Sequence, residues 1–479
     1  MPRGARANGK GRGAGESVPM QPSDAFFWYA EAATPELRPL VAGLFLLDRA
    51  PDPLRCRAAI ERLTRIMPRL RQSVVAPPFG IGLPAWRRHA EFDLDYHLRA
   101  VNLPAPATQA QLLAFLSETF STPLDHLRPL WEAHLIGGLE GGRSALFMKL
   151  HHAVLDGVGA NALFDVMSQA HRGDAVPPAP RPPRPATPQG TAAPLARLWR
   201  GSASLAHAAG QALGDPGDTL RQLTRLAQRM GGLAAEIAAA SAAPVGQAGS
   251  GIGRRLDTVV LSLPRLQRIK GRLGCTLNDL VLTMVSGALG RYQRRHGARV
   301  ETLTCLVPVN LRRADEHADL GNRVGGFVAQ LPVGERDPLA RLARIQAQTQ
   351  TAKRDGRGSA TQLLMQAGAL IPTAVLRGIV HQMGGRTQLI CSNVPGPPAQ
   401  RYLAGAKIEA VFPFAPVMFG TPLAIALVSY AATFGVGLAA DPGLIPDPER
   451  LVEYLVLEVD AIEARAARPP RPSASARTA

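Results

Sequence analysis

Between Ser144 and Gly157 the chain reads Ser-Ala-Leu-Phe-Met-Lys-Leu-His-His-Ala-Val-Leu-Asp-Gly. Residues 144–150 are largely apolar and rich in β-forming side chains, which predicts a buried strand. The segment that follows fits one face of a helix, with apolar side chains at Val158, Ala162, Leu163, Val166 and Met167. The pair His151-His152 therefore stands where a strand gives way to a loop and then a helix.

The two histidines are expected to differ in role. Successive strand residues point to opposite faces, so His151 and His152 cannot both project into one cavity. A neutral imidazole, with an ordinary pKa of about 6.5, accepts a proton from a hydroxyl at neutral pH. Asp156 could brace the turn as an acceptor, and Gly157 permits a tight backbone path. Two hydrogen-bonded core histidines are the alternative that this pair alone leaves open.

Several motifs of other protein classes are missing from the sequence. There is no HExxH motif or Cys/His cluster, so no metal site is predicted. The cysteines have no CxxC spacing, which argues against a disulfide scaffold and favours a reducing compartment; they are Cys56, Cys275, Cys305 and Cys391. No GxSxG elbow or phosphate-binding loop occurs, and the Gly- and Arg-rich first 17 residues predict no secretory signal.

The chain is strongly basic, with 54 Lys+Arg against 37 Asp+Glu and a net charge of +17. Most of this excess falls in residues 1–17, 172–230 and 464–479 rather than along a folded stripe. We therefore expect no nucleic-acid partner. Two explanations stay open: a GC-rich coding bias, and attraction of these segments to anionic lipid head groups, worth about 1 kcal/mol per basic residue near the surface.

An uncharged stretch, residues 410–440, is long enough to cross a membrane as a helix. Pro413, Pro416 and Pro422 interrupt it, as do glycines. The runs 423–430 and 433–438 fit two buried strands joined by a turn better than one helix. We expect no transmembrane segment here.

The sequence divides into five parts. Residues 1–20 and 465–479 are expected to be basic disordered tails, and 21–172 and 256–464 to be α/β domains. Residues 173–255 begin as a Pro-rich linker and continue as Ala-rich helices. The apolar stripe of residues 220–237, with Arg221, Arg225 and Arg229 on another face, is compatible with packing on the protein itself or on a lipid surface.

The spacing His151-His152-x-x-x-Asp156-Gly157 resembles the HHxxxDG motif of CoA-dependent acyltransferases related to chloramphenicol acetyltransferase and to peptide-synthetase condensation domains. Other segments, in order, resemble the bacterial wax ester synthase/acyl-CoA:diacylglycerol acyltransferase family over about residues 21–464. These are 92–98 (FDLDYHL), 128–132 (RPLWE), 277–279 (LND), 308–312 (PVNLR), 321–323 (GNR) and 392–397 (SNVPGP). The pair Asn310-Leu311 replaces the usual Ser-Val, and His126-Leu127 stands where Arg-Ser is common.

This resemblance implies an α/β fold of two chloramphenicol-acetyltransferase-like domains with mixed sheets, joined by the connector, with an active-site channel between them. It implies that His152 is the general base, with His151 and Asp156 in support. Supporting residues near the site are Gly157, Asn278, Asp279, Pro129, Leu130 and Trp131, although Asn278 and Asp279 could equally be helix-capping residues. Candidate contacts to substrate or CoA are Arg312, Arg323, Asn310 and Asn393.

The activity implied is transfer of a long-chain acyl group from acyl-CoA to diacylglycerol or a long-chain alcohol, without an acyl-enzyme, a metal or a resident cofactor. Such substrates imply a cytoplasmic protein, peripherally associated with the inner membrane or lipid droplets. Two alternatives remain open at this point. One is acylation of a specialised secondary-metabolite alcohol, and the other is a non-catalytic lipid-binding or droplet protein on the same scaffold.

Overall fold

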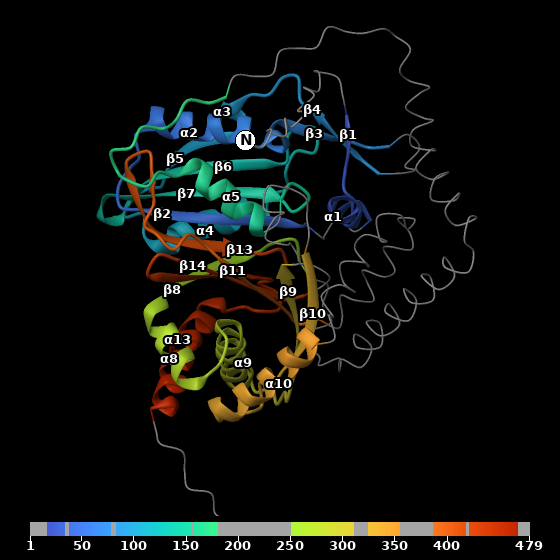
Figure 1. Cartoon of the computed structure of the whole chain (residues 1–479), viewed down its shortest axis with the longest axis vertical. Helices are drawn as coiled ribbons and strands as arrows, with labels where there is room; N and C mark the ends of the chain where they lie inside the picture. Colours follow the sequence, from blue (N-terminus) through green and yellow to red (C-terminus); the bar gives the residue numbers. More distant parts are fainter. Residues whose placement is uncertain are drawn as a thin grey trace, which may run out of the picture.

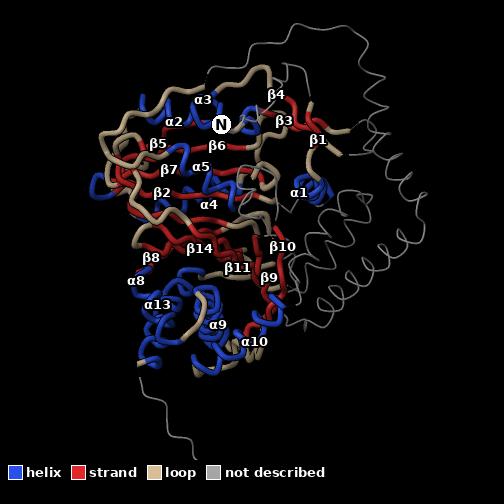
Figure 2. The backbone as a smooth tube through the Cα atoms, in the orientation of Figure 1, coloured by secondary structure: helices blue, strands red, loops and turns tan. Residues whose placement is uncertain are grey.

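The part of the chain described by the computed structural model contains two six-stranded sheets and one three-stranded sheet, with helices packed around them (Figures 1 and 2). The described residues are 17–33, 38–77, 83–155, 157–180, 251–310, 324–354, 387–417 and 421–467. The expected helix at 220–237 therefore lies outside them, as does most of the connector.

The first large sheet is mixed, as predicted, because β5 and β6 are parallel whereas the other neighbours are antiparallel. Its strands lie in the order β12 (Tyr402–Leu403), β13 (Ala406–Phe414), β2 (Leu40–Leu47), β7 (Arg143–His151), β6 (Trp131–Leu139) and β5 (Leu98–Asn102). The predicted strand at 144–150 is confirmed as β7, and the helix after it as α5 (Gly157–Met167).

Helices cover both faces of this sheet. On one face, α5 packs against β2 through Phe164 and Phe45, whose rings stack 5.5 Å apart, and α2 (Pro53–Ile66) lies beside α5. On the other face, the Nζ of Lys149 in β7 donates to the carbonyls of Thr119 and Thr122 at the end of α4 (Gln109–Ser121).

The three-stranded sheet and the first helix adjoin the ends of these strands. Its order is β1 (Val18–Pro19), β4 (Ala85–Arg88) and β3 (Gln72–Val75). The shorter elements nearby are α1 (Pro22–Ala33), η1 (Pro68–Arg71), α3 (Leu94–His97) and η3 (Glu140–Gly142). The expected tail of residues 1–20 is thus too long at its inner end, because Val18 pairs with Trp86 and the side chain of Met20 is buried.

The second large sheet carries its helices on the side away from the first, as Figure 2 shows. Its order is β10 (Val324–Leu331), β9 (Leu303–Asn310), β11 (Leu389–Pro395), β14 (Leu423–Tyr430), β15 (Thr433–Ala440) and β8 (Arg255–Ser262). The helices are α8 (Leu263–Leu273), α9 (Leu277–Arg295), α10 (Pro338–Arg354) and α13 (Pro448–Ala466). α13 continues to Ala466, so the expected tail of residues 465–479 includes the end of this helix.

The uncharged stretch at 410–440 folds as strands. β14 and β15 form the predicted antiparallel hairpin, pairing from Leu423 with Ala440 to Tyr430 with Thr433. Among the described residues, no single helix has both the length and the apolar character needed to span a bilayer. Only α8 and α9 taken together do, and they are bent by 101°.

One segment joins the two lobes directly. β12 and β13 fall within residues 256–464, yet β13 pairs with β2 in the first sheet. It also faces β15 so closely that a Cβ added at Gly435 or Gly437 would overlap the carbonyl oxygen of Val411 or Pro413. Both glycines therefore permit a close approach of the two sheets. The proposed division at residue 256 thus has this exception, in which a later segment completes the first sheet.

Candidate functional site

The site begins where β7 ends. His151 is the last residue of the strand and is fully buried, whereas His152 opens the turn that follows and is half-buried. The backbone N–H of His151 donates to Leu130 O at 3.0 Å, and that of His152 donates to Pro39 O at 2.7 Å. The neighbouring chain segments therefore hold the backbone of both histidines.

The ring of His151 is engaged at both nitrogens. Its Nδ1 lies 3.0 Å from the backbone N of Ala153, and its Nε2 lies 3.0 Å from Oε2 of Glu31 in α1. Because an amide N–H can only donate, Nδ1 must accept, so the proton sits on Nε2 and is donated to the carboxylate. Burial alone would raise the pKa of Glu31, but hydrogen bonds and charges from His126 and His151 lower it to about 2. His151 is thus held as a structural imidazole.

His152 has a different environment. The ring of Phe27, also in α1, stacks on its imidazole with centroids 4.1 Å apart and planes inclined by 18°. The stacked ring covers one face of the imidazole and limits its rotation. The pair therefore divides into a buried ring at the strand end and a half-buried ring in the turn that follows.

Arg69 binds the backbone of the same turn. Its guanidinium donates to the carbonyl of Val154 at 3.1 Å and, more weakly, to that of Ala153 at 3.5 Å. It also forms an ion pair of 2.9 Å with Asp24 of α1, a fully buried carboxylate. A buried ion pair of this kind is costly to break, because removing one partner leaves the other charge uncompensated.

The RPLWE segment packs beneath the histidines. Pro129, Leu130 and Trp131 are buried, and the indole Nε1 of Trp131 donates to Leu70 O at 2.8 Å. The ring of His97, from the FDLDYHL segment, stacks on Trp131 at 4.7 Å and contacts its carbonyl oxygen through Nδ1 at 2.7 Å. Burial lowers the pKa of His97 to about 4, so this histidine is neutral at physiological pH.

The last residue of the RPLWE segment, Glu132, is the partner of a buried lysine. Glu132 pairs with Lys149 of β7, with Oε1 and Nζ 2.5 Å apart and the lysine side chain fully buried. Burial raises the pKa of Glu132, but the nearby His134, with its Nε2 3.7 Å from Oε1, and the charge of Lys149 lower it to about 2. Two segments that look separate in the sequence therefore form one cluster under the turn.

The other predicted site residues lie on different elements. Asp279 completes a capping box at the start of α9, accepting from the backbone of Thr276 at 3.0 Å, and it also accepts from the hydroxyl of Thr349 at 2.8 Å. Asn278, the residue before Asp279, lies in the same first turn of α9.

The remaining positions lie in the second sheet, at the start of α5 or outside the described residues. Asn310 ends β9, Asn393 is in β11, and Gly157 opens α5. The SNVPGP segment, whose first four residues belong to β11, meets the first lobe, since the side-chain amide of Asn161 donates to Pro395 O at 2.6 Å. The side chain of Asn310 lies outside the described part, as do the predicted residues Asp156, Arg312 and Arg323.

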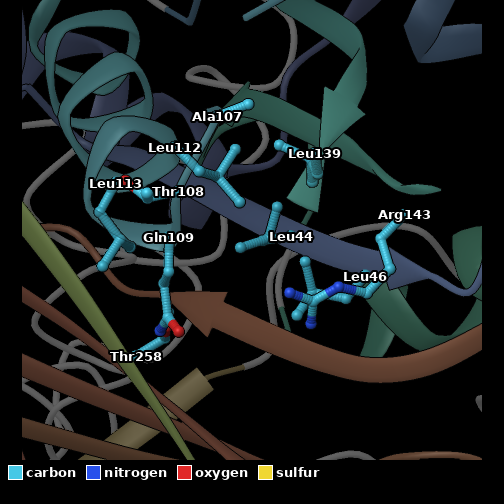
Figure 3. Close-up of a pocket in the computed structure, with 10 residues that line it drawn as sticks. All are labelled: Leu44, Leu46, Ala107, Thr108, Gln109, Leu112, Leu113, Leu139, Arg143 and Thr258. Atoms are coloured by element: carbon cyan, nitrogen blue, oxygen red, sulfur yellow. The ribbon is translucent and has the colours of Figure 1, made fainter. Parts of the chain in front are cut away.

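Figure 3 shows the residues that line a hollow of about 390 Å³, a volume that includes open solvent. The hollow adjoins the start of β7, at the opposite end of the strand from His152. It is lined mostly by apolar side chains from β2 and α4, and Gln109 reaches across it toward Thr258 of β8. Arg143, the first residue of β7, is at its rim. This hollow is therefore remote from the histidine turn.

The sequence reasoning did not identify Asp24, Phe27, Glu31 or Arg69. The first three recur at spacings of three and four along α1, a helical face that the sequence could have suggested. Their partners are far away in the chain, and no local pattern indicates them. Within the described ranges there is also no group of three or more His, Cys, Asp or Glu that could hold a metal ion.

Comparisons with known proteins give a consistent result. The family model described as the wax ester synthase/diacylglycerol acyltransferase catalytic domain matches residues 20–281, and the WS/DGAT C-terminal domain matches 320–463. The O-acyltransferase WSD of Acinetobacter baylyi is 31% identical over 93% of this chain and 97% of its own. A Mycobacterium tuberculosis protein named as a diacylglycerol O-acyltransferase is 33% identical over 91% of this chain and 90% of its own.

Solved structures agree. The wax ester synthase/diacylglycerol acyltransferase of Marinobacter aquaeolei VT8 has a TM-score of 0.67 and 25% identity, covering 94% of this chain and all (100%) of that one. The first condensation domain of the calcium-dependent antibiotic synthetase has a TM-score of 0.61 over 94% of this chain and 98% of its own; at 17% identity it is similar in fold alone. The chain that carries the His151–His152 turn on this two-lobed fold belongs to the wax ester synthase/diacylglycerol acyltransferase family.

Proposed function

We propose that this protein transfers a long-chain acyl group from a CoA thioester to the hydroxyl of a diacylglycerol or a long-chain alcohol, giving triacylglycerol or wax ester. Family membership and the names of its relatives support the reaction class. The observation that carries the residue assignment is the contrast between two adjacent imidazoles. His151 is locked by Glu31 and Ala153, whereas His152 is half-buried beyond the strand end.

In this mechanism His152 accepts the proton of the acceptor hydroxyl as its oxygen attacks the thioester carbonyl. The tetrahedral intermediate then collapses, the C–S bond breaks, and the imidazolium returns the proton to the departing CoA thiolate. The products are the ester and free CoA, with no covalent acyl-enzyme. A positioned general base contributes about 10²–10⁴-fold, and holding both substrates together supplies a further part of the acceleration.

The experiment compares His152→Ala with His171→Ala, an exposed histidine outside the turn, as the matched control. Radiolabelled acyl-CoA is incubated with hexadecanol or a diacylglycerol, and the lipid products are separated by chromatography. We expect His152→Ala to lose about 10²–10⁴-fold in kcat and His171→Ala to retain activity. Retained turnover in His152→Ala, with unchanged melting, would contradict the assignment. Intact mass after incubation with acyl-CoA alone tests direct transfer, because an acyl adduct would oppose it.

We further propose that the protein associates peripherally with an anionic membrane or lipid-droplet surface, where such substrates reside. The support is the basic excess of the chain, including Arg221, Arg225 and Arg229. Replacing these three arginines by glutamine should reduce co-sedimentation with phosphatidylglycerol vesicles at low salt. Unchanged sedimentation would reject this face as the contact.

A further inference from the structure

One face of α1 contacts the histidine turn at two points and reaches it at a third through Arg69. Asp24, Phe27 and Glu31 are separated by three and four residues, which places their side chains on one side of the helix. Glu31 and Phe27 contact the rings of His151 and His152, whereas Asp24 acts on the turn through Arg69. A single helix therefore acts on the turn at all three points.

The Glu31 contact sets the orientation of the structural histidine. Its carboxylate accepts from Nε2 of His151 at 3.0 Å, which leaves Nδ1 of that ring to accept from Ala153 N at 3.0 Å. The second bond closes the turn that contains His152. Without the carboxylate, the buried Nε2–H of His151 would lose this acceptor, and only the N–H of Ala153 would still favour the Nε2-protonated tautomer.

The other two contacts act on the same turn. Phe27 stacks on His152 at 4.1 Å, and Asp24 holds Arg69, which donates to the carbonyls of Ala153 and Val154. The turn is thus held through the ring of His152, the amide of Ala153 and the carbonyls of Ala153 and Val154. A reacting group displaced by about 1 Å can lose about 10²-fold in rate, so this degree of constraint matters for catalysis.

We propose that the Asp24–Phe27–Glu31 face of α1 positions His152 for acyl transfer, with Glu31 acting as a positioning residue through His151. This proposal rests on the proposed function. It assigns Glu31 no contact with substrate: its effect is to fix the tautomer and orientation of His151, and thereby the turn that presents His152.

The test compares three substitutions of Glu31 in the full chain. Glu31→Gln keeps the length and an accepting oxygen but removes the charge, whereas Glu31→Asp keeps the charge and withdraws it by one methylene. Glu31→Leu removes the acceptor altogether. If reach and hydrogen bonding position the turn, kcat should follow the order wild type, Gln, Asp, Leu. The Leu variant should lose about 10–100-fold, with KM for acyl-CoA and for the alcohol changed by less than about threefold.

A spectroscopic readout separates positioning from general loss of structure. In protein labelled with ¹⁵N-histidine, the His151 signals should report the Nε2–H tautomer in the wild type and in Glu31→Gln, and a mixture of tautomers in Glu31→Leu. Phe26→Leu, a buried change in the same helix, serves as the packing control and should leave both the tautomer and kcat near those of the wild type.

The proposal is overturned if Glu31→Leu keeps kcat within twofold of the wild type, or if Glu31→Asp is more active than Glu31→Gln. If Glu31→Leu does not fold, the comparison of Asp with Gln still decides. Failure of the proposed function is distinguishable, because it requires that His152→Ala remain active. An inactive His152→Ala beside a fully active Glu31→Leu rejects only the positioning role.

Discussion

Replacing Gly437 by alanine tests whether the two sheets depend on close contact at β13. Gly437 lies in β15, paired with Ala426 of β14 and with Thr258 of β8. An added Cβ would overlap the carbonyl oxygen of Pro413, which belongs to the backbone of β13. A backbone atom cannot rotate away as a side chain can, so relief requires β13 or β15 to move, and β13 is hydrogen-bonded to β2.

The expected cost follows from the kind of overlap. Forcing one extra carbon into a packed interior costs about 1–3 kcal/mol, and the upper end applies where the neighbour is main chain. With about 2–4 °C of melting temperature per kcal/mol for a unit of 150–250 residues, a cost of about 2–3 kcal/mol lowers the melting temperature by roughly 4–12 °C. Gly435→Ala, which meets the Val411 carbonyl, should behave similarly. The double variant should fall short of the sum, because both act on β13.

The matched control is Gly271→Ala. Gly271 lies inside α8, and a Cβ there would have no neighbour within 4 Å. Alanine in an open helix position should stabilise by about 0.5–1 kcal/mol. Thermal unfolding followed by circular dichroism therefore should show opposite shifts for two identical chemical changes. A Gly437→Ala protein with the same melting temperature as the wild type would refute the close contact of the sheets.

Two further predictions concern charges near the turn. The carboxylate of Glu31, whose Oε2 lies 3.2 Å from Nε2 of His126, raises the pKa of His126 above its ordinary value of 6.5. The resulting ion pair stabilises the fold below that ordinary value and is lost as the pH rises through the raised pKa, so stability should fall from about pH 6.5 upward. His126→Arg should reduce that fall, as measured by melting temperature across the range; equal falls in both proteins would contradict the pairing. Lys149→Met leaves the Glu132 carboxylate without its cation and should lower the free energy of unfolding, measured in urea, by about 3–5 kcal/mol. Adding Glu132→Leu removes the unpaired charge and should restore most of this loss. A double variant as unstable as Lys149→Met would contradict this explanation.

Local patterns in the sequence were sufficient for much of the fold. The apolar run before His151 predicted β7, the two runs after Pro422 predicted the β14–β15 hairpin, and the capping interpretation of Asp279 agrees with the start of α9. Each of these depends on residues a few positions apart, where the periodicity of strands and helices and the chemistry of caps are directly readable.

The remaining features depend on contacts between distant segments. The strands predicted at 423–430 and 433–438 did not include Ala406–Phe414, and no local pattern indicates that this segment pairs with Leu40–Leu47. Likewise, an acidic residue at position 31 carries no sign of its partner at His151, because many glutamates on helices face solvent. The family resemblance indicated His152, while the residues that hold its turn became visible only in three dimensions.

The placement of β13 has a consequence for how the chain can be made and divided. The first lobe is encoded mainly before residue 172, but one side of β2 stays without its neighbouring strand until Phe414 has left the ribosome. An unpaired strand edge is a template for association with other chains. Cutting the gene within the connector would therefore yield an amino-terminal half with an unpaired, aggregation-prone strand edge rather than an independently folding domain.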